Sequence, residues 1–417
     1  MKRKALTLGN YRHTLTVIRS LANAGFDVIV GRDEARTFTQ FSRYASEIWD
    51  HPKFEEQDAF ILALALLLNA RSDIQLVFPI GESVLKCIAQ NLDRIPAHAR
   101  IIMPDPVTLL TCLDKARIYE IVSALHIPLP ESRVARNFSE LVVEAKSVGF
   151  PCIIKPNCSL NYFFNKKAIF CGSMDDIEKY FVLWPGGNEF LILQRYIEGY
   201  RPNCHFAAMH GRVLVYFEHD VIRTDRVDMT GLEVDGVSVP PTPILRKYCE
   251  TLVQHLDYTG VGCIQFIADR QTSSFYFLEI NPRLDATCVL PYHCGLDFPR
   301  MAVDLTGGSG ECLPSWIESS IDYPVGRRVH WLLGDLRGLV HGLEDRTVNF
   351  YAVIRWLRQM LNALKMSDFH LTFSWRDPLP TGFLYWRMIV SGWNRVRSRV
   401  RARFAESSHR DTNQGAH

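Results

Sequence analysis

Three polar side chains between residues 261 and 281 have the types and the spacing to bind a hard metal ion. Two apolar runs flank a polar segment centred on Thr272, and this pattern predicts a β-hairpin. With that centre, Gln265 faces Glu279 across the hairpin, and the two-residue period of a strand places Asn281 on the same face. One carboxylate and two amide oxygens suit Mg²⁺, which takes its remaining ligands from phosphate and water. We therefore predict a magnesium site on this hairpin.

Arg283 follows the hairpin directly after a proline, where its planar guanidinium can donate to a phosphate or to a charged transition state. A short string such as Glu-x-Asn-Pro-Arg also arises by chance, so one alternative is that Glu279 and Asn281 only end an edge strand. The rest of the sequence is needed to decide between the two interpretations.

The spacing of Gln265, Glu279, Asn281 and Arg283 resembles the metal-binding hairpin of the ATP-grasp superfamily. The resemblance is strongest to its carbamoyl-phosphate-synthetase-like and carboxylate–amine ligase branch, and it covers roughly residues 5–310. Other segments resemble further landmarks of the superfamily in the same order, and their ranges are 113–130, 149–156 and 191–199.

The resemblance implies an ATP-grasp fold, in which the nucleotide lies between two lobes, with ATP and Mg²⁺ as cofactors and Mn²⁺ as the alternative ion. No Walker loop is present, so two lysines and a cation are what the site needs to hold a triphosphate of about four negative charges. The residues that the resemblance assigns to ATP are Lys115, Lys155, Gln194, Arg195, Tyr196, Ile197, Asn203 and Glu279. The residues that it assigns to catalysis are Lys155 and Arg283.

Two segments depart from the pattern of the superfamily. The flap expected over the phosphates, at 157–167, contains no glycine, the residue that lets backbone amides approach a phosphate closely. Its side chains Ser159, Asn161 or Lys166 are the candidates to replace that contact. The acidic residue expected to bind ribose after Gly199 is also missing, which leaves Asn203 as the candidate there.

The implied activity is that of an ADP-forming ligase, which activates a carboxylate as an acylphosphate for displacement by an amine, or less often by a thiol. The alternatives are a carboxylase, a small-molecule kinase, or a catalytically weakened protein that only binds ATP. Loop residues Asn10, Arg12 and Glu82 are candidate contacts to the acceptor substrate, because they follow predicted parallel strands. Arg223 and Arg226 are candidate contacts to a phosphate or a carboxylate.

These residues require an α/β fold. A strand, a helix and a second strand within residues 5–30 predict a parallel, Rossmann-like sheet, and the dinucleotide fingerprint G-x-G-x-x-G is absent. The predicted units are a Rossmann-like domain at 1–104, the small lobe at 105–186, the large lobe with the metal hairpin at 187–310, a mainly helical extension at 311–405 and a disordered tail at 406–417.

Length and composition agree with an intracellular multi-lobed enzyme, and a nucleic-acid partner is not expected because the basic cluster is confined to the C-terminal part. Hydrophobic residues make up 47% of the 417 residues and the net charge is +2, and no signal peptide is recognisable. The 11 cysteines form no C-x-x-C pair, so we predict reduced core thiols and a cytoplasmic location. The apolar run Ala59 to Leu68 predicts a buried helix, since it is too short to cross a bilayer.

The C-terminal part has a different character. Residues 350–364 show apolar side chains at helical spacing, and 383–404 combine tryptophan with many arginines. Such a segment is typical of a helix at the surface of an anionic membrane, here the inner surface, and the alternative is a helix docked on the protein. The expected partners are the small-molecule carboxylate and amine substrates of the implied ligase. The C-terminal segment adds a peripheral contact with a membrane. The sequence gives no indication of oligomeric state.

Overall fold

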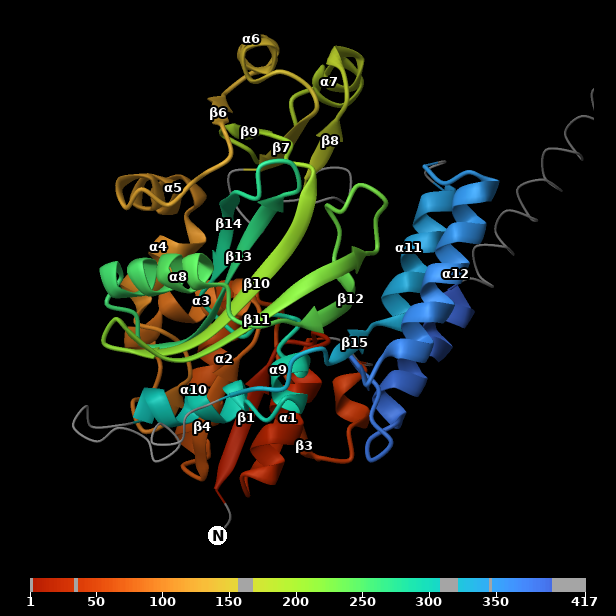
Figure 1. Ribbon diagram of the computed structural model, residues 1–417. Helices are drawn as coiled ribbons and strands as arrows, with labels where there is room; N and C mark the ends of the chain where they lie inside the picture. Colours follow the sequence, from red (N-terminus) through yellow and green to blue (C-terminus); the bar gives the residue numbers. More distant parts are fainter. Residues whose placement is uncertain (1–2, 34–36, 157–167, 308–321, 345–346, 392–417) are drawn as a thin grey trace, which may run out of the picture.

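A computed structural model describes residues 3–33, 37–156, 168–307, 322–344 and 347–391 of the chain, which form three sheets with helices around them (Figure 1). The predicted flap at 157–167 and the predicted disordered tail at 406–417 lie outside the described residues. The predicted α/β fold is confirmed.

The N-terminal lobe is a five-stranded parallel sheet, as its strand–helix–strand sequence predicts. In spatial order its strands are β3 (Ala45–Asp50), β2 (Asp27–Arg32), β1 (Lys4–Leu8), β4 (Ile74–Pro79) and β5 (Arg100–Ile101). Its helices are α1 (Thr14–Asn23), α2 (Gln57–Ala70), α3 (Glu82–Ala89) and α4 (Pro106–Leu113), with 3₁₀ turns η1 (Thr39–Phe41) and η2 (Leu92–Arg94). The loops after β1 and β4 lie side by side at the carboxyl edge, where such sheets bind ligands.

Helix α2 corrects one prediction. Phe60, Ile61 and Leu64 are fully buried against the sheet, but Leu62 and Leu66 are 58% and 61% exposed. The apolar run Ala59 to Leu68 is thus a helix with only one buried face. A continuous apolar run hides which face packs, because helical periodicity can be read only where polar residues interrupt it.

The small lobe is a four-stranded antiparallel sheet with its own core. In spatial order its strands are β6 (Ser132–Ala135), β9 (Leu191–Arg195), β7 (Cys152–Pro156) and β8 (Ile169–Cys171). Its helices are α6 (Phe138–Val148) and α7 (Met174–Phe181), whereas α5 (Lys115–Ala124) packs its buried face on the core of the large lobe. The predicted boundary at 186 is therefore too early, because β9 lies between β6 and β7 in this sheet.

The large lobe is built on a seven-stranded sheet. In spatial order its strands are β14 (Phe275–Asn281), β13 (Gly260–Asp269), β10 (Gly199–Met209), β11 (Arg212–Thr224), β12 (Glu233–Ser238), β15 (Arg328–His330) and β16 (Phe369–His370). Its helices are α8 (Pro243–His255), α9 (Val289–His293) and α10 (Phe298–Gly307). One face packs on α8, and the other shares a continuous core with α1 and the parallel sheet. The large sheet and the N-terminal lobe thus form one packed body.

The C-terminal extension is helical but not separate. It contains α11 (Leu332–Glu344), α12 (Phe350–Met366) and a helix from 379 to 391. The extension is mainly helical, as predicted, and its two short strands β15 and β16 add to the edge of the large sheet. The buried carboxylate of Asp377 accepts a hydrogen bond from Arg19 Nε of α1 at 3.0 Å and another from Ser42 Oγ at 2.8 Å. The extension is thereby fastened to the N-terminal lobe.

Nine cysteines among the described residues are free and buried, as predicted for reduced core thiols. Cys158 and Cys312 lie outside the described residues. Within the described part of the chain, no helix is both long and apolar enough to cross a bilayer.

Candidate nucleotide and metal site

The hairpin of β13 and β14 has the predicted register at its functional end. Gln265 pairs with Glu279, which confirms the prediction from a turn centred on Thr272. A register shift follows between Gln265 and Phe266, so the pairing nearer the turn is displaced by one residue. Such an irregularity is a β-bulge, which locally re-aims side chains. It lies directly beside the predicted metal ligands.

The three predicted metal ligands lie together on one face of this hairpin. Asn281 is 4% exposed, and its Nδ2 lies 3.5 Å from Glu279 Oε1. Gln265 and Glu279 are half-buried, so their oxygens remain reachable from outside. Directly opposite residues of an antiparallel pair share a face, which places the amide of Gln265 beside the carboxylate of Glu279. This is an all-oxygen donor set of low charge, as Mg²⁺ prefers.

A polar row continues from this hairpin across the large sheet. In register from β14 to β12, the row contains Glu279, Gln265, Asn203, His219 and Ser238. Each residue lies opposite the next, so all five share one face of the sheet. Polar side chains from five strands therefore lie in a row on one face of the sheet, opposite the face that packs on α8.

Asn203 is held inside this row. Its Nδ2 lies 3.2 Å from His219 Nε2 and 3.5 Å from Glu233 Oε2, and its Oδ1 is buried without a hydrogen-bond partner among the described residues. His219 Nε2 lies 3.0 Å from the same Glu233 oxygen. Although burial opposes the charged ring, Glu233 raises the pKa of His219. The ribose contact of Asn203 stays a prediction, with Oδ1 as its available atom.

Lys155 of the small lobe lies near the hairpin, and Lys115, at the start of α5, lies close to Lys155. Lys155 Nζ donates to Gln194 Oε1 at 2.8 Å, and Lys115 Nζ donates to the carbonyl of Pro156 at 3.4 Å. Burial, and then the neighbouring charge of Lys115, lower the pKa of Lys155 to about 8, while Glu279 opposes that shift. Two crowded ammonium groups beside the metal hairpin are suited to a polyphosphate, which would relieve their repulsion.

The predicted adenine segment begins within β9 and continues past it. Gln194 is 2% exposed, and its Nε2 donates to Ser132 Oγ at 3.0 Å. Its amide is therefore used at both ends, by Ser132 and by Lys155, so its contact to adenine stays a prediction. Tyr196 packs edge-on against Phe170 with ring centroids 5.0 Å apart. The side chains of Arg195 and Ile197 are exposed and half-buried respectively.

Arg283 links the large lobe to the N-terminal lobe. Its Nη2 donates to Glu82 Oε1 at 3.0 Å, and the two side chains are only 15% and 9% exposed. Glu82 is the first residue of α3, after the loop that follows β4. Burial opposes the charge of Arg283, but Glu82 and Asp285 raise its pKa overall. The predicted acceptor contact Glu82 thus fixes the predicted catalytic arginine.

Two further arginines from different lobes, Arg12 and Arg201, form what we call the arginine pair. Arg12 Nη1 donates to the carbonyl of Glu233, and Arg201 Nη2 donates to the carbonyl of Gly231, each at 3.0 Å. In an extended chain these carbonyls lie about 7 Å apart, so the two guanidinium groups are neighbours. Burial lowers the pKa of both, and no carboxylate among the described residues lies within ion-pairing distance of either.

The other predicted acceptor contacts are used within the protein. Arg223 donates through Nη1 and Nη2 to Asp335 of α11, at 3.0 and 2.5 Å. Asn10 donates to the carbonyl of Gly31 at 3.4 Å. Arg226 lies in the loop after β11, and its backbone bonds to Thr224 Oγ1. Of the N-terminal candidates, Arg12 is the one with a guanidinium beside the large sheet.

Sequence reasoning missed the polar face of β10 as a site. Arg201, Asn203 and His205 alternate with apolar residues, and this two-residue spacing predicts a shared face. The spacing along β10 was therefore visible in the sequence. Two further side chains, those of Cys263 and Asp285, lie close to His205 but come from distant segments. The pairing of β10 with β13 places Cys263 beside His205, and the segment after β14 brings Asp285 to them.

Comparison with known proteins agrees with this geometry. Residues 240–310, which contain the hairpin, match the family described as the carbamoyl-phosphate synthase L chain, ATP binding domain. The arginine-specific carbamoyl phosphate synthase large chain of Bacillus subtilis is 24% identical over 337 residues, covering 75% of this chain and 32% of that protein. The corresponding Geobacillus stearothermophilus protein is 28% identical over 289 residues, covering 64% and 26%. The chain thus spans a third or less of these curated relatives.

Solved structures show the same fold. Biotin carboxylase from Campylobacter jejuni superposes with a TM-score of 0.61 at 16% identity, covering 79% of this chain and 74% of that one. N5-carboxyaminoimidazole synthetase from Staphylococcus aureus, complexed with ADP, superposes with a TM-score of 0.60 at 11% identity, covering 79% and 82%. The resemblance read from the sequence is confirmed at the level of the fold.

Proposed function

We propose that this ATP-grasp protein is an ADP-forming ligase that activates a carboxylate as an acylphosphate for attack by an amine. One observation carries the proposal: Lys155, with Lys115 close by, lies within electrostatic reach of Glu279, on the hairpin where Gln265, Glu279 and Asn281 share one face. Cations and oxygen donors from two lobes form the arrangement that a metal-bound triphosphate needs. The relatives named above support the same class of chemistry.

The residues suit the implied ligands. Glu279, Gln265 and Asn281 would hold Mg²⁺, which when bound neutralises phosphate charge. Lys115 and Lys155 would bind the phosphates, and Arg283 would stabilise charge on the transferring phosphoryl group. None of these side chains acts as a nucleophile. Rate enhancement would come from positioning and electrostatics, so catalysis would depend on how these charges are arranged.

The arginine pair supports a carboxylate as the group to be activated. A partly buried guanidinium that forms no ion pair carries a desolvation cost, which nearby carboxylates offset in part and an anionic ligand would offset further. Arg12 and Arg201 are both half-buried, so each presents part of its side chain toward the outside. Arg12 also lies 4.4 Å over the ring of Trp331, which fixes its direction. We infer that the pair binds the carboxylate substrate.

The test of the proposed function is ADP release by the purified protein with Mg²⁺ and ATP against pooled amino acids and small carboxylates. ADP that appears only with a carboxylate and an amine together supports the ligase. Dependence on bicarbonate would indicate a carboxylase, and a stable phosphorylated acceptor would indicate a kinase. ATP that raises the melting temperature without turnover in any pool would favour the weakened, ATP-binding alternative.

Replacing Arg12 by methionine is expected to raise the KM for the carboxylate about 10- to 100-fold, since a charge-assisted hydrogen bond contributes about 1.5–3 kcal/mol. The kcat should change much less, because Arg12 would bind the carboxylate equally in the ground state and in the transition state. Steady-state kinetics with the substrate pair found in the screen checks this. Arg246→Met is the control, since Arg246 is an exposed residue of α8 paired with Glu250. An unchanged KM in Arg12→Met would contradict the assignment.

A second feature, the outer face of α12, favours contact with a membrane surface. Trp356, Met360 and Ala363 are buried, but a second apolar stripe faces outward on the same helix. The stripe consists of Phe350, Leu357, Leu361 and Leu364, which are 73%, 37%, 61% and 38% exposed. Figure 1 shows α12 standing at the side of the molecule. An exposed apolar stripe of this kind is typical of a surface that contacts another molecule or a membrane.

The positive charge of α12 favours an anionic membrane as the partner of this apolar stripe. Helix α12 contains Arg355, Arg358 and Lys365 and no acidic residue. Each basic residue near an anionic surface adds about 1 kcal/mol of attraction. The arginine-rich residues 392–404, which follow the helix from 379 to 391, lie outside the described part of the chain. We propose that α12 lies on the membrane through its outer stripe.

Replacing Leu361 by glutamate is expected to lower binding to phosphatidylserine-containing vesicles about tenfold or more, since burying a leucine contributes about 1.5–3 kcal/mol. Co-sedimentation of the full chain measures this. Leu66→Glu on α2 is the matched control, because Leu66 and Leu361 are both 61% exposed. Equal binding of both variants, or a wild-type chain that forms a dimer through this face, would contradict membrane contact.

A further inference from the structure

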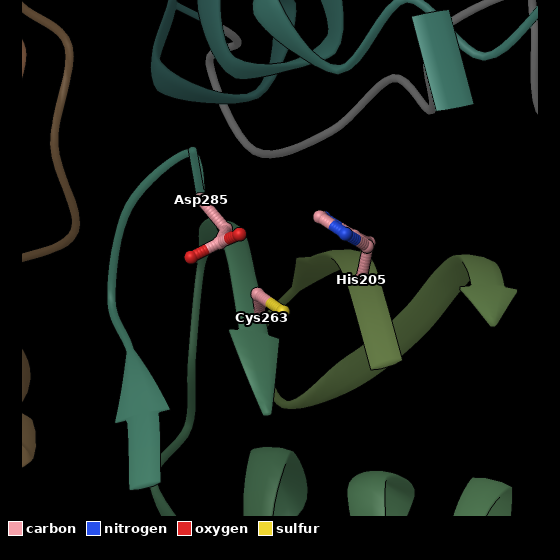
Figure 2. Close-up of side chains that lie close together, drawn as sticks. All are labelled: His205, Cys263 and Asp285. Atoms are coloured by element: carbon pink, nitrogen blue, oxygen red, sulfur yellow. The ribbon is translucent and has the colours of Figure 1, made fainter. Parts of the chain in front are cut away.

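We propose that His205, Cys263 and Asp285 bind one transition-metal ion of the zinc class, at a site separate from the magnesium hairpin. Figure 2 shows the three side chains converging from β10, from β13 and from the segment after β14. All three are buried, and their ligand atoms lie within 4.8 Å of one another. The proposed ligase chemistry does not require this group, so the inference goes beyond the proposed function.

The sheet fixes two of the ligands. Cys263 pairs with His205 on one side and with Asn281 on the other, so all three side chains share the polar face. Central strands hold such positions more rigidly than loops do. The proposed ion would therefore lie one strand away from Asn281, and its two strand ligands would be held rigidly.

The donor set distinguishes this site from the hairpin. An imidazole nitrogen, a thiolate sulfur and a carboxylate oxygen are zinc ligands, whereas Mg²⁺ takes oxygen donors. In a tetrahedral zinc site with bonds of about 2.0–2.3 Å, the ligand atoms lie roughly 3.3–3.8 Å apart. Closing the group around an ion thus requires shifts of about 1 Å, and a fourth position would remain open for a small ligand.

Thr287 orients two of the three ligands. Its hydroxyl donates to Asp285 Oδ1 at 2.5 Å and lies 3.2 Å from His205 Nε2. Because the single hydroxyl hydrogen goes to Asp285, Nε2 must carry its own hydrogen and donate to Thr287. This tautomer leaves the lone pair of His205 on Nδ1. The backbone N–H of Thr287 also donates to Asp285 Oδ1, at 3.0 Å, so Oδ2 is the carboxylate oxygen left for a metal.

This arrangement matches how proteins prepare metal ligands. A ligating histidine usually uses its other ring N–H in a hydrogen bond that fixes the ring, and ligating carboxylates are hydrogen-bonded in turn. Here one threonine performs both tasks. A bound ion would cross-link β10, β13 and the segment that carries Arg283, so its role would be to position residues beside the nucleotide site.

The test uses Co²⁺ and Zn²⁺ on the full chain after treatment with a chelator, in excess Mg²⁺ so that the hairpin does not compete. We expect one Co²⁺ per chain and a thiolate-to-cobalt charge-transfer band in the absorption spectrum. Cys263→Ala should lose the band and the stoichiometric binding. Cys249→Ala should keep both, since Cys249 is an equally buried thiol on α8.

Thr287→Val keeps the ligands and removes the orienting hydroxyl, so it is expected to weaken Zn²⁺ binding about 10- to 100-fold. This variant provides the test if Cys263→Ala does not fold. Absence of the band in the wild-type chain would overturn the proposal, and so would a band that persists in Cys263→Ala. Both readouts are independent of ADP release, so a failed ligase assay would leave this inference standing.

Discussion

Replacing Glu279 by alanine is expected to lower ADP release about a thousandfold or more, because a catalytic metal ion contributes several kcal/mol of transition-state stabilisation. Glu279 is the single carboxylate among the three hairpin ligands, and Gln265 and Asn281 offer only neutral amide oxygens. Without its charge, the remaining donors would hold Mg²⁺ weakly. The measurement is ADP release with the substrate pair found in the screen, as a function of Mg²⁺ concentration.

Glu144→Ala is a suitable control, because Glu144 is a partly exposed glutamate of α6 in the small lobe. It should retain wild-type turnover. Glu279→Gln should fail nearly as fully as Glu279→Ala, since the charge and not the size of the side chain binds the ion. Full activity of either Glu279 variant would remove the hairpin from the mechanism.

Replacing Arg283 by alanine is expected to lower kcat about a hundredfold or more, the loss typical of a preorganised group that stabilises transition-state charge. Arg283→Lys should restore little, because an ammonium does not reproduce the planar fork of the guanidinium. Steady-state kinetics at saturating ATP and substrates measures the effect. Wild-type kcat in Arg283→Ala would show that this arginine has no part in catalysis.

Arg283 also has a structural partner, and the two roles need separating. Its loss breaks the ion pair with the buried carboxylate of Glu82, and breaking a buried pair from one side destabilises a protein by about 3–5 kcal/mol. The double variant Arg283→Ala with Glu82→Gln removes that penalty. We expect it to recover thermal stability but not kcat. Recovery of both would mean that the arginine only joins the lobes.

The hairpin could be predicted from the sequence because its signal is local. Alternating residues on both sides of a polar turn define a register, and the pairing of Gln265 with Glu279 follows from counting. The bulge beside Gln265 could not be predicted, because no residue type in the hairpin marks it. A local sequence pattern thus predicts which residues are metal ligands but not the exact direction of their side chains.

Features that depend on distant pairing could not be predicted. Strand β9 reads like any apolar strand, and only its partners β6 and β7 assign it to the small lobe. The strands β15 and β16 contain three and two residues, too few to show a period. The group of His205, Cys263 and Asp285 comes from three segments. For these features the sequence contains the strands and side chains but does not show which of them are neighbours in the fold.

The fastening of the C-terminal extension limits how the chain can be shortened. Cutting after residue 323 would remove Asp377 and leave the guanidinium of Arg19 buried without its carboxylate. It would also strip β15 from β12 and open a row of unpaired backbone groups, the kind of surface that recruits other chains into aggregates. A recombinant fragment trimmed to the nucleotide-binding lobes would therefore be less soluble than the whole chain, however complete its catalytic residues.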